Sequence, residues 1–250
     1  MITFLVTRAI AAVTATLAAS SARNMWQTYQ MIHTAEEHDT NKIDPPPILF
    51  SKDCCVDDAV EEIQKLNRKE FLNLYRGCGS VADLSLVEGD WNGVLLENNG
   101  QIMTWISNFM THQLFSKGPR RWDGKSFGKD NKGTNLFRTY EGGNIEREHR
   151  IDYTVEPSFY GSDKDAISVK YKNYQDIFSL WRTMGDEVKI LRTDFTDGEV
   201  LLGMGCMGWS GGFLNGSPFC LYRKEPLETS LFMTVDDTQQ LVPGGRPKAD

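Results

Sequence analysis

The stretch Gly89-Asp90-Trp91-Asn92-Gly93, together with Phe219-Cys220-Leu221-Tyr222-Arg223, decides the fold of this 250-residue chain. A Gly-x-Trp segment that opens one strand and an arginine that ends the last strand are typical of a small closed antiparallel barrel. We expect the indole of Trp91 to close the narrow end, with the guanidinium of Arg223 over its face as a cation–π partner. Barrel closure is therefore assigned to Gly89, Trp91, Gly93 and Arg223.

From Leu86 onward, short alternating runs are separated by turn residues such as Asn98-Asn99-Gly100 and Gly142-Gly143-Asn144. Closely spaced strands without a long helix between them indicate a sandwich or a barrel. We predict a mainly β chain in which residues 84–224 form a calycin-like, or lipocalin-like, antiparallel barrel of about 8–10 strands. The candidate strands are 90–97, 101–108, 120–127, 134–140, 149–155, 166–172, 186–194, 198–205 and 217–224.

The regions that flank the barrel are polar or helical. Residues 54–80 are predicted as one helix docked on the barrel, with Asp57 as its cap, Gly77 as its stop and apolar residues at helical spacing. Residues 36–53 contain three consecutive prolines and are interpreted as a stiff polar linker. Residues 225–250 are interpreted as a flexible tail.

Residues 1–35 resemble a targeting leader in composition, because they carry arginines but no Asp or Glu and are rich in Ala, Thr and Ser. This composition predicts an organellar transit peptide for a plastid or a mitochondrion. A secretory signal peptide is the alternative, with Ala9–Ala19 as its apolar segment and Ser20-Ser21-Ala22 as its cleavage site. We expect the working protein to lack this leader.

Charge and hydropathy limit the classes of partner. A net charge of -7 argues against nucleic-acid binding, which needs clustered cations. No run of 18 apolar residues is present, so no transmembrane span is predicted. The histidines are scattered and no C-x-x-C occurs, so no metal site is predicted either.

The five cysteines allow two interpretations. In an oxidising compartment, Cys54 or Cys55 is expected to form a disulfide with Cys78 or with the barrel. In a reducing compartment all five are expected to be buried thiols.

Residues 203–208, Gly-Met-Gly-Cys-Met-Gly, match the dinucleotide-binding pattern G-x-G-x-x-G. That chemistry needs a helix N-terminus immediately afterwards, and the glycine-rich residues 209–218 cannot begin one. We therefore predict no nucleotide and no other cofactor. The glycines instead indicate close approach of the backbone to a neighbouring strand or to a bound molecule.

Three segments resemble the GXWXG family of bacterial proteins of unknown function: 72–76, 89–93 and Trp122-Asp123-Gly124-Lys125-Ser126-Phe127. The resemblance covers about residues 70–224, and it implies a lipocalin-like or fatty-acid-binding-protein-like barrel without implying an activity. The cysteines, the leader and the glycine-rich segment 203–216 depart from that pattern.

The same Gly-x-Trp-x-Gly segment is similar to that of the nitrobindin haem barrels, which carry an axial histidine near the barrel end. No histidine follows His149 here, so His112 and His149 are the candidates for such a ligand. Packing or surface positions are the alternative for both.

Seven residues are predicted to contact a ligand. Apolar and aromatic residues beside Ile102 and Ile106, or beside the glycines, would form its wall, and two polar residues would anchor it at the pocket mouth. The wall residues are Trp105, Phe109, Met204, Met207 and Trp209, and the anchors are Arg138 and Tyr153. Plain core packing is the alternative for the five wall residues.

The predicted function is non-catalytic binding of a small hydrophobic molecule, such as a lipid, an isoprenoid or a pigment-like compound. One alternative is an accessory subunit of an organellar membrane complex, with the barrel filled by its own side chains. The other is a barrel enzyme that uses a buried carboxyl, Asp152 or Asp194, with Tyr153 on a hydrophobic substrate. The adjacent acids Asp186 and Glu187 are expected on opposite faces of a strand, so no catalytic residue is assigned.

Overall fold

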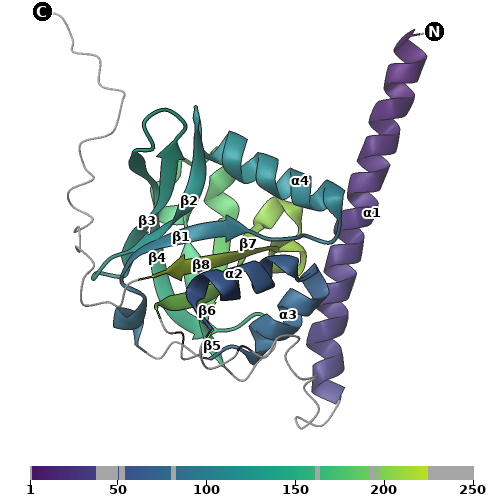
Figure 1. Cartoon of the computed structure of the whole chain (residues 1–250). Coiled ribbons are helices and arrows are strands. Elements are labelled where there is room, and N and C mark those ends of the chain that lie inside the picture. Colours follow the sequence, from purple (N-terminus) through teal and green to yellow (C-terminus); the bar gives the residue numbers. More distant parts are fainter. Residues whose placement is uncertain are drawn as a thin grey trace, which may run out of the picture.

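The computed structural model describes residues 2–37, 50, 54–79, 83–160, 164–191, 195 and 197–224, with the side chains of the first helix described for residues 14–33. Within these residues, eight antiparallel strands close into one barrel, each paired with the next along the chain and the last with the first (Figure 1). The strands are β1 Gly89–Leu95, β2 Arg120–Phe127, β3 Lys132–Thr139, β4 Ile145–Pro157, β5 Asp165–Lys170, β6 Met184–Ile190, β7 Glu199–Met207 and β8 Ser217–Arg223. The predicted antiparallel barrel is confirmed.

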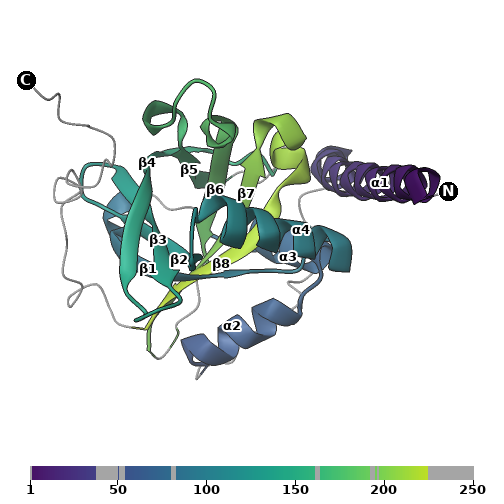
Figure 2. The same cartoon turned by 90° about the horizontal axis from the view of Figure 1, so that it is seen from above.

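The strand order places the connections at two ends. Those of β1–β2, β3–β4, β5–β6 and β7–β8 share one end, which we call the mouth; the start of β1 and the end of β8 lie at the other, which we call the floor. Short helical segments in the β1–β2, β5–β6 and β7–β8 connections lie at the mouth, and α4 crosses it (Figure 2). These segments are 3-10 turns at Lys172–Tyr174, Leu180–Thr183, Gly208–Ser210 and Gly212–Asn215, and a π-helical segment at Met110–Phe115.

The predicted strand at 101–108 is wrong, because this segment is helix α4, Gln101–Phe109. Ile102, Trp105, Ile106 and Phe109 recur at i, i+3, i+4 and i+7, which is a helical repeat. Gly100 adopts a φ of 106° at the start of the helix, and its carbonyl accepts a hydrogen bond from the amide of Thr104 at 3.0 Å. A left-handed φ at that position favours glycine.

The single helix predicted over 54–80 is two helices, α2 Val56–Lys65 and α3 Arg68–Gly77. The break is local: Asn67 and Glu70 form a capping box that starts α3. Cys55, rather than Asp57, caps α2. Helix α2 packs on the outside of β7 and β8, and the buried faces of both helices join one apolar cluster with those strands, which includes Ile63, Tyr75 and Leu202.

A long helix, α1 Ile2–Glu37, runs along one side of the barrel (Figures 1 and 2). It contacts α4 and the β7–β8 connection. Asn24 and Thr28 of α1 are fully buried, and Thr28 accepts a hydrogen bond from Arg68 of α3 at 3.1 Å. Among the helices of the described residues, none combines the length and apolarity needed for crossing a membrane.

At the floor, the side chain of Arg223 covers that of Trp91, and both are buried. The indole nitrogen of Trp91 donates to the carbonyl of Val87 at 2.7 Å. The Arg223 guanidinium donates to the carbonyls of Leu86 and Glu88 at 2.9 and 2.7 Å. The first and last strands and the 3-10 turn Leu84–Val87 are therefore joined at one point.

The two tryptophan segments singled out in the sequence pack against each other. A Cβ atom at Gly93 would lie 2.5 Å from the ring of Trp122, so the ring occupies the space that a larger residue would need. Gly124, with a φ of 145°, lies against the backbone of Trp91. Only glycine fits two such close approaches between β1 and β2.

A candidate ligand-binding cavity at the mouth of the barrel

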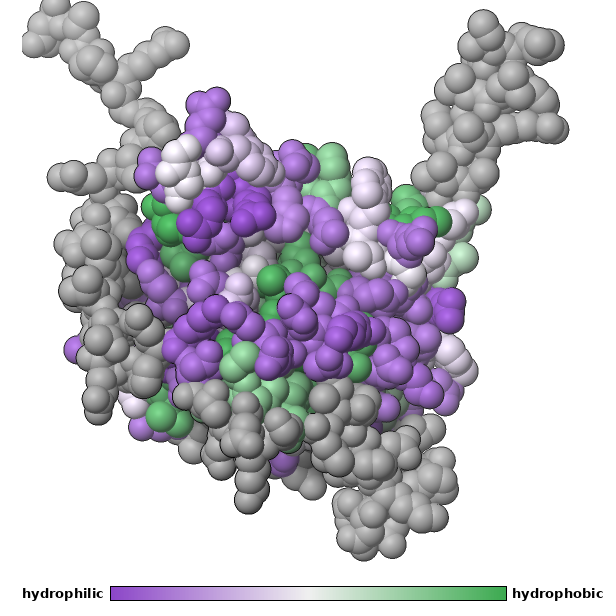
Figure 3. All heavy atoms as spheres, viewed as in Figure 1, coloured by the Kyte–Doolittle hydropathy of each residue, from purple (hydrophilic) through white to green (hydrophobic). Residues whose placement is uncertain are grey.

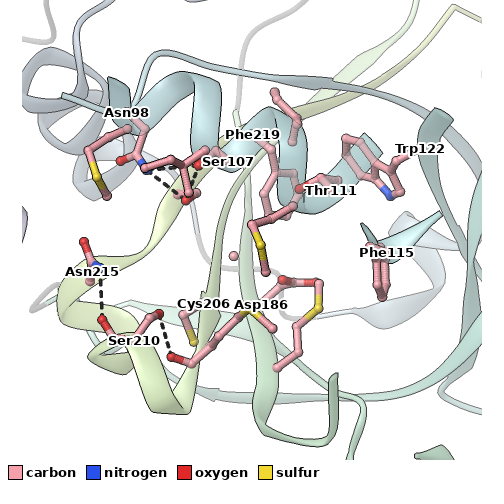
Figure 4. Close-up of a pocket in the computed structure, with 18 of the residues that line it drawn as sticks. Asn98, Ser107, Thr111, Phe115, Trp122, Asp186, Cys206, Ser210, Asn215 and Phe219 are labelled. Carbon is pink, nitrogen blue, oxygen red and sulfur yellow. Dashed lines mark hydrogen bonds between the residues drawn. The ribbon is translucent and has the colours of Figure 1, made fainter. Parts of the chain in front are cut away.

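The barrel encloses a cavity of about 330 Å³ at its mouth (Figure 4). This volume falls within the range of small-molecule sites, roughly 300–1,000 Å³. The wall is mainly aromatic and methionine, and it includes Phe115, Trp122, Trp181, Phe219, Met103, Met110, Met184 and Met207. Most polar lining residues gather in two places, one deep in the barrel and one beside α1.

The deep polar group is a buried ion pair. The Lys125 ammonium lies 2.7 Å from Oδ2 of Asp186, and each side chain is 2% exposed. The same ammonium donates to the Tyr171 hydroxyl at 2.6 Å and to Oδ1 of Asn135 at 2.9 Å. Aromatic faces also surround the charge, with the Tyr171 ring centroid 5.3 Å from Nζ. The carboxylate thus balances the charge of the ammonium, and hydrogen bonds occupy its protons, as burial inside an apolar barrel requires.

A second layer of contacts holds this group in place. Tyr171 donates to Oδ2 of Asp186 at 2.8 Å, and the Trp122 indole donates to Asn135 at 3.1 Å. Asn135 in turn donates to the carbonyl of His149 at 3.2 Å. Burial, reinforced by the Asp186 carboxylate, raises the pKa of Tyr171 well above its ordinary value. Tyr171 therefore stays a neutral phenol and a hydrogen-bond donor.

Local backbone geometry brings these residues together. Pairing of β2 with β3 shifts register between Trp122 and Gly124, and both Trp122 and Lys125 then line the cavity although they are three residues apart. On β6, Asp186 lines the cavity opposite Gly205 of β7. A Cβ atom at Gly205 would lie 3.0 Å from Oδ1 of Asp186, so the glycine leaves room for the carboxylate.

Asp186 and Glu187 point to opposite faces of β6, as alternation predicts. Glu187 accepts hydrogen bonds from the Tyr75 hydroxyl at 2.9 Å, from Ser158 at 2.5 Å and from the amide of Phe159 at 2.8 Å. It therefore belongs to the contact between α3 and the barrel, while Asp186 belongs to the cavity.

The second polar group closes the side of the cavity next to α1. Asn98 donates to the hydroxyl of Ser217 at 2.9 Å, and the hydroxyls of Ser107 and Ser217 lie 2.7 Å apart (Figure 4). Asn24 of α1 donates to Oδ1 of Asn98 at 3.2 Å. Ser21 of α1 lines the cavity and accepts from Asn215 at 2.8 Å. Side-chain hydrogen bonds thus join helix α1 to the cavity wall.

Of the seven residues predicted to contact a ligand, Met207 and Trp209 line the cavity. Trp105 and Phe109 were expected to be buried, and this is wrong. They stack on each other on the outer face of α4, 64% and 41% exposed, because a helix turns Ile106 and Met110 toward the cavity instead.

The other three predicted contacts lie away from the cavity lining. Met204 is in the core between the barrel and α2–α3, because it alternates with the inward-facing glycines of β7. Arg138 forms an ion pair with Asp123, at 2.7 Å, and is partly exposed. Tyr153 is buried, packs on Phe127 and donates to the carbonyl of Gly128 on the β2–β3 connection at the floor, so it is no anchor at the mouth.

The carboxyl–tyrosine pair beside the cavity consists of other residues than the enzyme hypothesis predicted. Asp152 accepts hydrogen bonds from Asn173 and Tyr174 rather than from Tyr153. Asp194 lies outside the described residues. The buried pair beside the cavity is Asp186 with Tyr171, and strand alternation was the sequence signal that could have identified Asp186.

His149 is a packing residue. Its ring stacks on Phe115 at 4.1 Å, Nε2 donates to the Phe115 carbonyl at 2.9 Å, and Nδ1 lies 3.3 Å from the amide nitrogen of Gln175. Burial lowers its pKa to about 4, so the ring is neutral at physiological pH. Both ring nitrogens are engaged, which leaves neither for an axial haem bond. His112 lies on the π-helical segment.

All five cysteines fall within the described residues and are free thiols. Cys54 and Cys55 precede α2 and Cys78 follows α3, without the disulfide considered for an oxidising compartment. Burial raises the pKa of the Cys78 and Cys206 thiols to about 12. Such thiols are unreactive at neutral pH.

The fold and the cavity define the class of this protein, a closed up-and-down β-barrel with an interior cavity. No protein-family model matches the chain, and no curated protein matches it. A protein from Thermomonospora curvata, known from its crystal structure, is 14% identical and superposes with a TM-score of 0.45, over 68% of this chain and 96% of that one. A likeness this distant carries no argument about function.

Proposed function

We propose that this protein binds a small hydrophobic molecule inside its barrel without catalysing a reaction on it. The observation that carries the proposal is the cavity itself, which combines an apolar wall with polar groups that lie mostly in two places. Binding sites for small molecules share this composition, because apolar surface supplies affinity while a few polar groups set orientation.

The wall suits a flexible or flat apolar ligand. Aromatic rings from Phe115, Trp122, Trp181 and Phe219 offer broad faces, and methionines can adapt to irregular shapes. Burial of apolar ligand surface contributes roughly 25 cal/mol per Å². About 300 Å² of such surface contributes about 7 kcal/mol before the free-energy cost of ordering the ligand is subtracted.

Fluorescence of the full-length protein tests the proposal directly, because Trp122 and Trp181 line the cavity. Titration with Nile red, an uncharged apolar dye, should give saturable emission and quench tryptophan fluorescence. A Met184→Trp variant, which fills the cavity, should lose this binding. Trp105→Phe, on the exposed face of α4, is the matched control and should retain it. Equal dye binding by both variants would place the dye elsewhere and refute the proposal.

A barrel enzyme is the second candidate, and one observation favours it: Asp186 and Tyr171 form a hydrogen-bonded carboxyl–tyrosine pair beside the cavity. Such a pair could transfer a proton to a hydrophobic substrate. Turnover with a bell-shaped pH profile, abolished in Asp186→Asn, would support the enzyme over the binding protein.

A subunit role in a membrane complex receives less support. That role expects a barrel filled by its own side chains, whereas this barrel holds a cavity of about 330 Å³. On the face shown in Figure 3, hydrophilic residues predominate among those described, and hydrophobic residues form small separate areas. Broad apolar patches, by contrast, mark protein interaction sites.

For location, we propose an organelle, on the acid-free composition of residues 1–35. The buried contacts of Asn24 and Thr28 favour retention of this part of α1 in the folded protein. Cell fractionation with an antibody tests the location. Mass spectrometry of the intact protein from its native source tests retention, since a mature N-terminus beyond residue 28 would contradict it.

A further inference from the structure

The deep end of the cavity carries a charge pair whose chemistry limits what can bind beside it. Lys125 and Asp186 are the charged residues among the described residues that line the cavity. Their charges cancel, and both side chains are 2% exposed. A ligand carboxylate would add an uncompensated negative charge to this apolar space, and a ligand ammonium an uncompensated positive one. The pair therefore favours an uncharged ligand.

The hydrogen bonds already made by Lys125 limit the polar groups that a ligand can carry at this end of the cavity. An ammonium group has three protons. Those of Lys125 are directed to Asp186, Tyr171 and Asn135, at 2.7, 2.6 and 2.9 Å. No ammonium proton is left for a ligand carbonyl, so a ketone or an ester finds no donor there.

Asp186 retains an acceptor. Its contacts with the described side chains of Lys125 and Tyr171 all reach Oδ2. Oδ1 faces Gly205, where a Cβ atom would lie only 3.0 Å away, so the missing side chain leaves this side of the oxygen unobstructed. Asp186 and Gly205 both line the cavity, and Asp186 lies next to Cys206 in the pocket (Figure 4). A ligand that donates a hydrogen bond can use this oxygen.

We infer that the cavity recognises an apolar alcohol, whose hydroxyl donates to Oδ1 of Asp186, and discriminates against the corresponding ketone and carboxylate. This inference rests on the proposed binding function and names the chemical class of its ligand. Aromatic side chains and methionines would enclose the hydrocarbon part, while the hydroxyl points toward the ion pair. Hydrogen bonds to a charged group are strong enough to give at least about a tenfold preference over an analogue that lacks the donor.

A matched ligand series tests the inference on the full-length protein. 1-Decanol, 2-decanone and decanoate at pH 8 share a chain length and differ in the polar group. Each is titrated against bound Nile red and, independently, by calorimetry. The expected order of affinity is decanol first, by at least about tenfold over decanone, with decanoate weakest. Equal binding of decanol and decanone, or tighter binding of decanoate, would overturn the inference.

Two variants probe the mechanism of selection. Asp186→Asn removes the carboxylate and leaves Lys125 without its counter-charge, so decanoate should become the preferred ligand. Gly205→Ala places a methyl group 3.0 Å from Oδ1 and should remove the preference for decanol over decanone. Glu187→Gln is the control, because this acid is also buried on the same strand but faces α3. It should keep the wild-type order.

The outcomes separate the inference from the function on which it rests. If neither Nile red nor any of the three compounds binds, the binding function and the inference both fail. If the compounds bind in another order, the binding function stands and the inference fails. The comparison of the three compounds on the unmodified protein decides the matter even if a variant does not fold.

Discussion

The guanidinium carbon of Arg223 lies 4.2 Å from the ring centroid of Trp91, and the contact joins the last strand of the barrel to the first. The same guanidinium donates to two backbone carbonyls and to the carboxylate of Glu199, at 2.6 Å from Nε. Because a planar guanidinium can stack on a ring and donate in its own plane at the same time, one residue serves both contacts.

Replacement of Arg223 by lysine tests this closure. The charge is retained, but an ammonium cannot reach both carbonyls and Glu199 while stacked on the indole. We expect a loss of about 2 kcal/mol in the free energy of unfolding, measured by urea denaturation with circular dichroism. Arg121→Lys, at an exposed position, should leave the midpoint unchanged. Equal midpoints for the two variants would contradict the role of Arg223.

The close packing of β1 on β2 predicts that a larger residue at Gly93 strongly destabilises the protein. An alanine there would bring Cβ within 2.5 Å of the Trp122 ring, which is itself held by its hydrogen bond to Asn135. Overpacking of this kind destabilises by about 1–3 kcal/mol. Gly77→Ala is the control, since a Cβ atom at Gly77 would have no neighbouring atom within 4 Å. Thermal unfolding of both variants provides the measurement, and a Gly93→Ala protein as stable as Gly77→Ala would disprove the fit.

Acid should destabilise the protein through His149. Its pKa is lowered to about 4 in the folded state, against about 6.5 in an unfolded chain. The unfolded state therefore binds a proton first as the pH falls, and stability decreases between about pH 6.5 and pH 4. The full loss is about 3 kcal/mol.

Urea unfolding at several pH values across this window measures the effect. His149→Gln replaces the imidazole by an amide, which can still hydrogen-bond but does not titrate, so the stability of this variant should vary less over the same window. Three charged residues act electrostatically on His149, namely Glu148, Lys117 and Arg120, and both proteins contain them. The difference between the two proteins in the slope of stability against pH is therefore specific to the imidazole. Identical slopes would show that the proton binds elsewhere.

Contacts of α1 predict how fast a ligand exchanges. Asn24 is buried, donates to Oδ1 of Asn98 and accepts from Nδ2 of Asn99, and its replacement by alanine removes both hydrogen bonds. We expect a loss of about 1–2 kcal/mol in stability and faster dissociation of Nile red in stopped-flow experiments, because α1 covers one side of the cavity. Trp26→Phe, on the exposed side of α1, should leave the rate unchanged. An unaltered rate in Asn24→Ala would mean that the dye enters by another route.

The strands were predictable because alternation is a local property. Each strand from β2 to β8 corresponds to an alternating run bounded by turn residues, and the ends differ by a few residues. The prediction of a strand at 101–108 failed because apolar residues at helical spacing were interpreted as a strand. The break between α2 and α3 could have been predicted from the sequence, since Asn67 and Glu70 have the spacing of a capping box.

The apolar residues that line the cavity were partly predictable from the sequence, and its charged residues were not. Met207 and Trp209 were identified from their place beside the glycines, and they line it. Lys125 was missed because the register shift after Trp122 changes which residues face inward, and sequence alternation alone does not reveal such a shift. Asp186 was set aside as half of an acidic pair, although its neighbour faces the other side of the strand.

The sequence by itself determined that alternating strands between a glycine–tryptophan segment and a terminal arginine form an antiparallel barrel. The reason is that alternation and turn chemistry act over a few residues. Only the tertiary structure decided that Lys125 of β2 meets Asp186 of β6 inside that barrel, and that α1 covers the cavity beside them. Such contacts join distant parts of the chain, and they depend on the closure and register of the whole sheet.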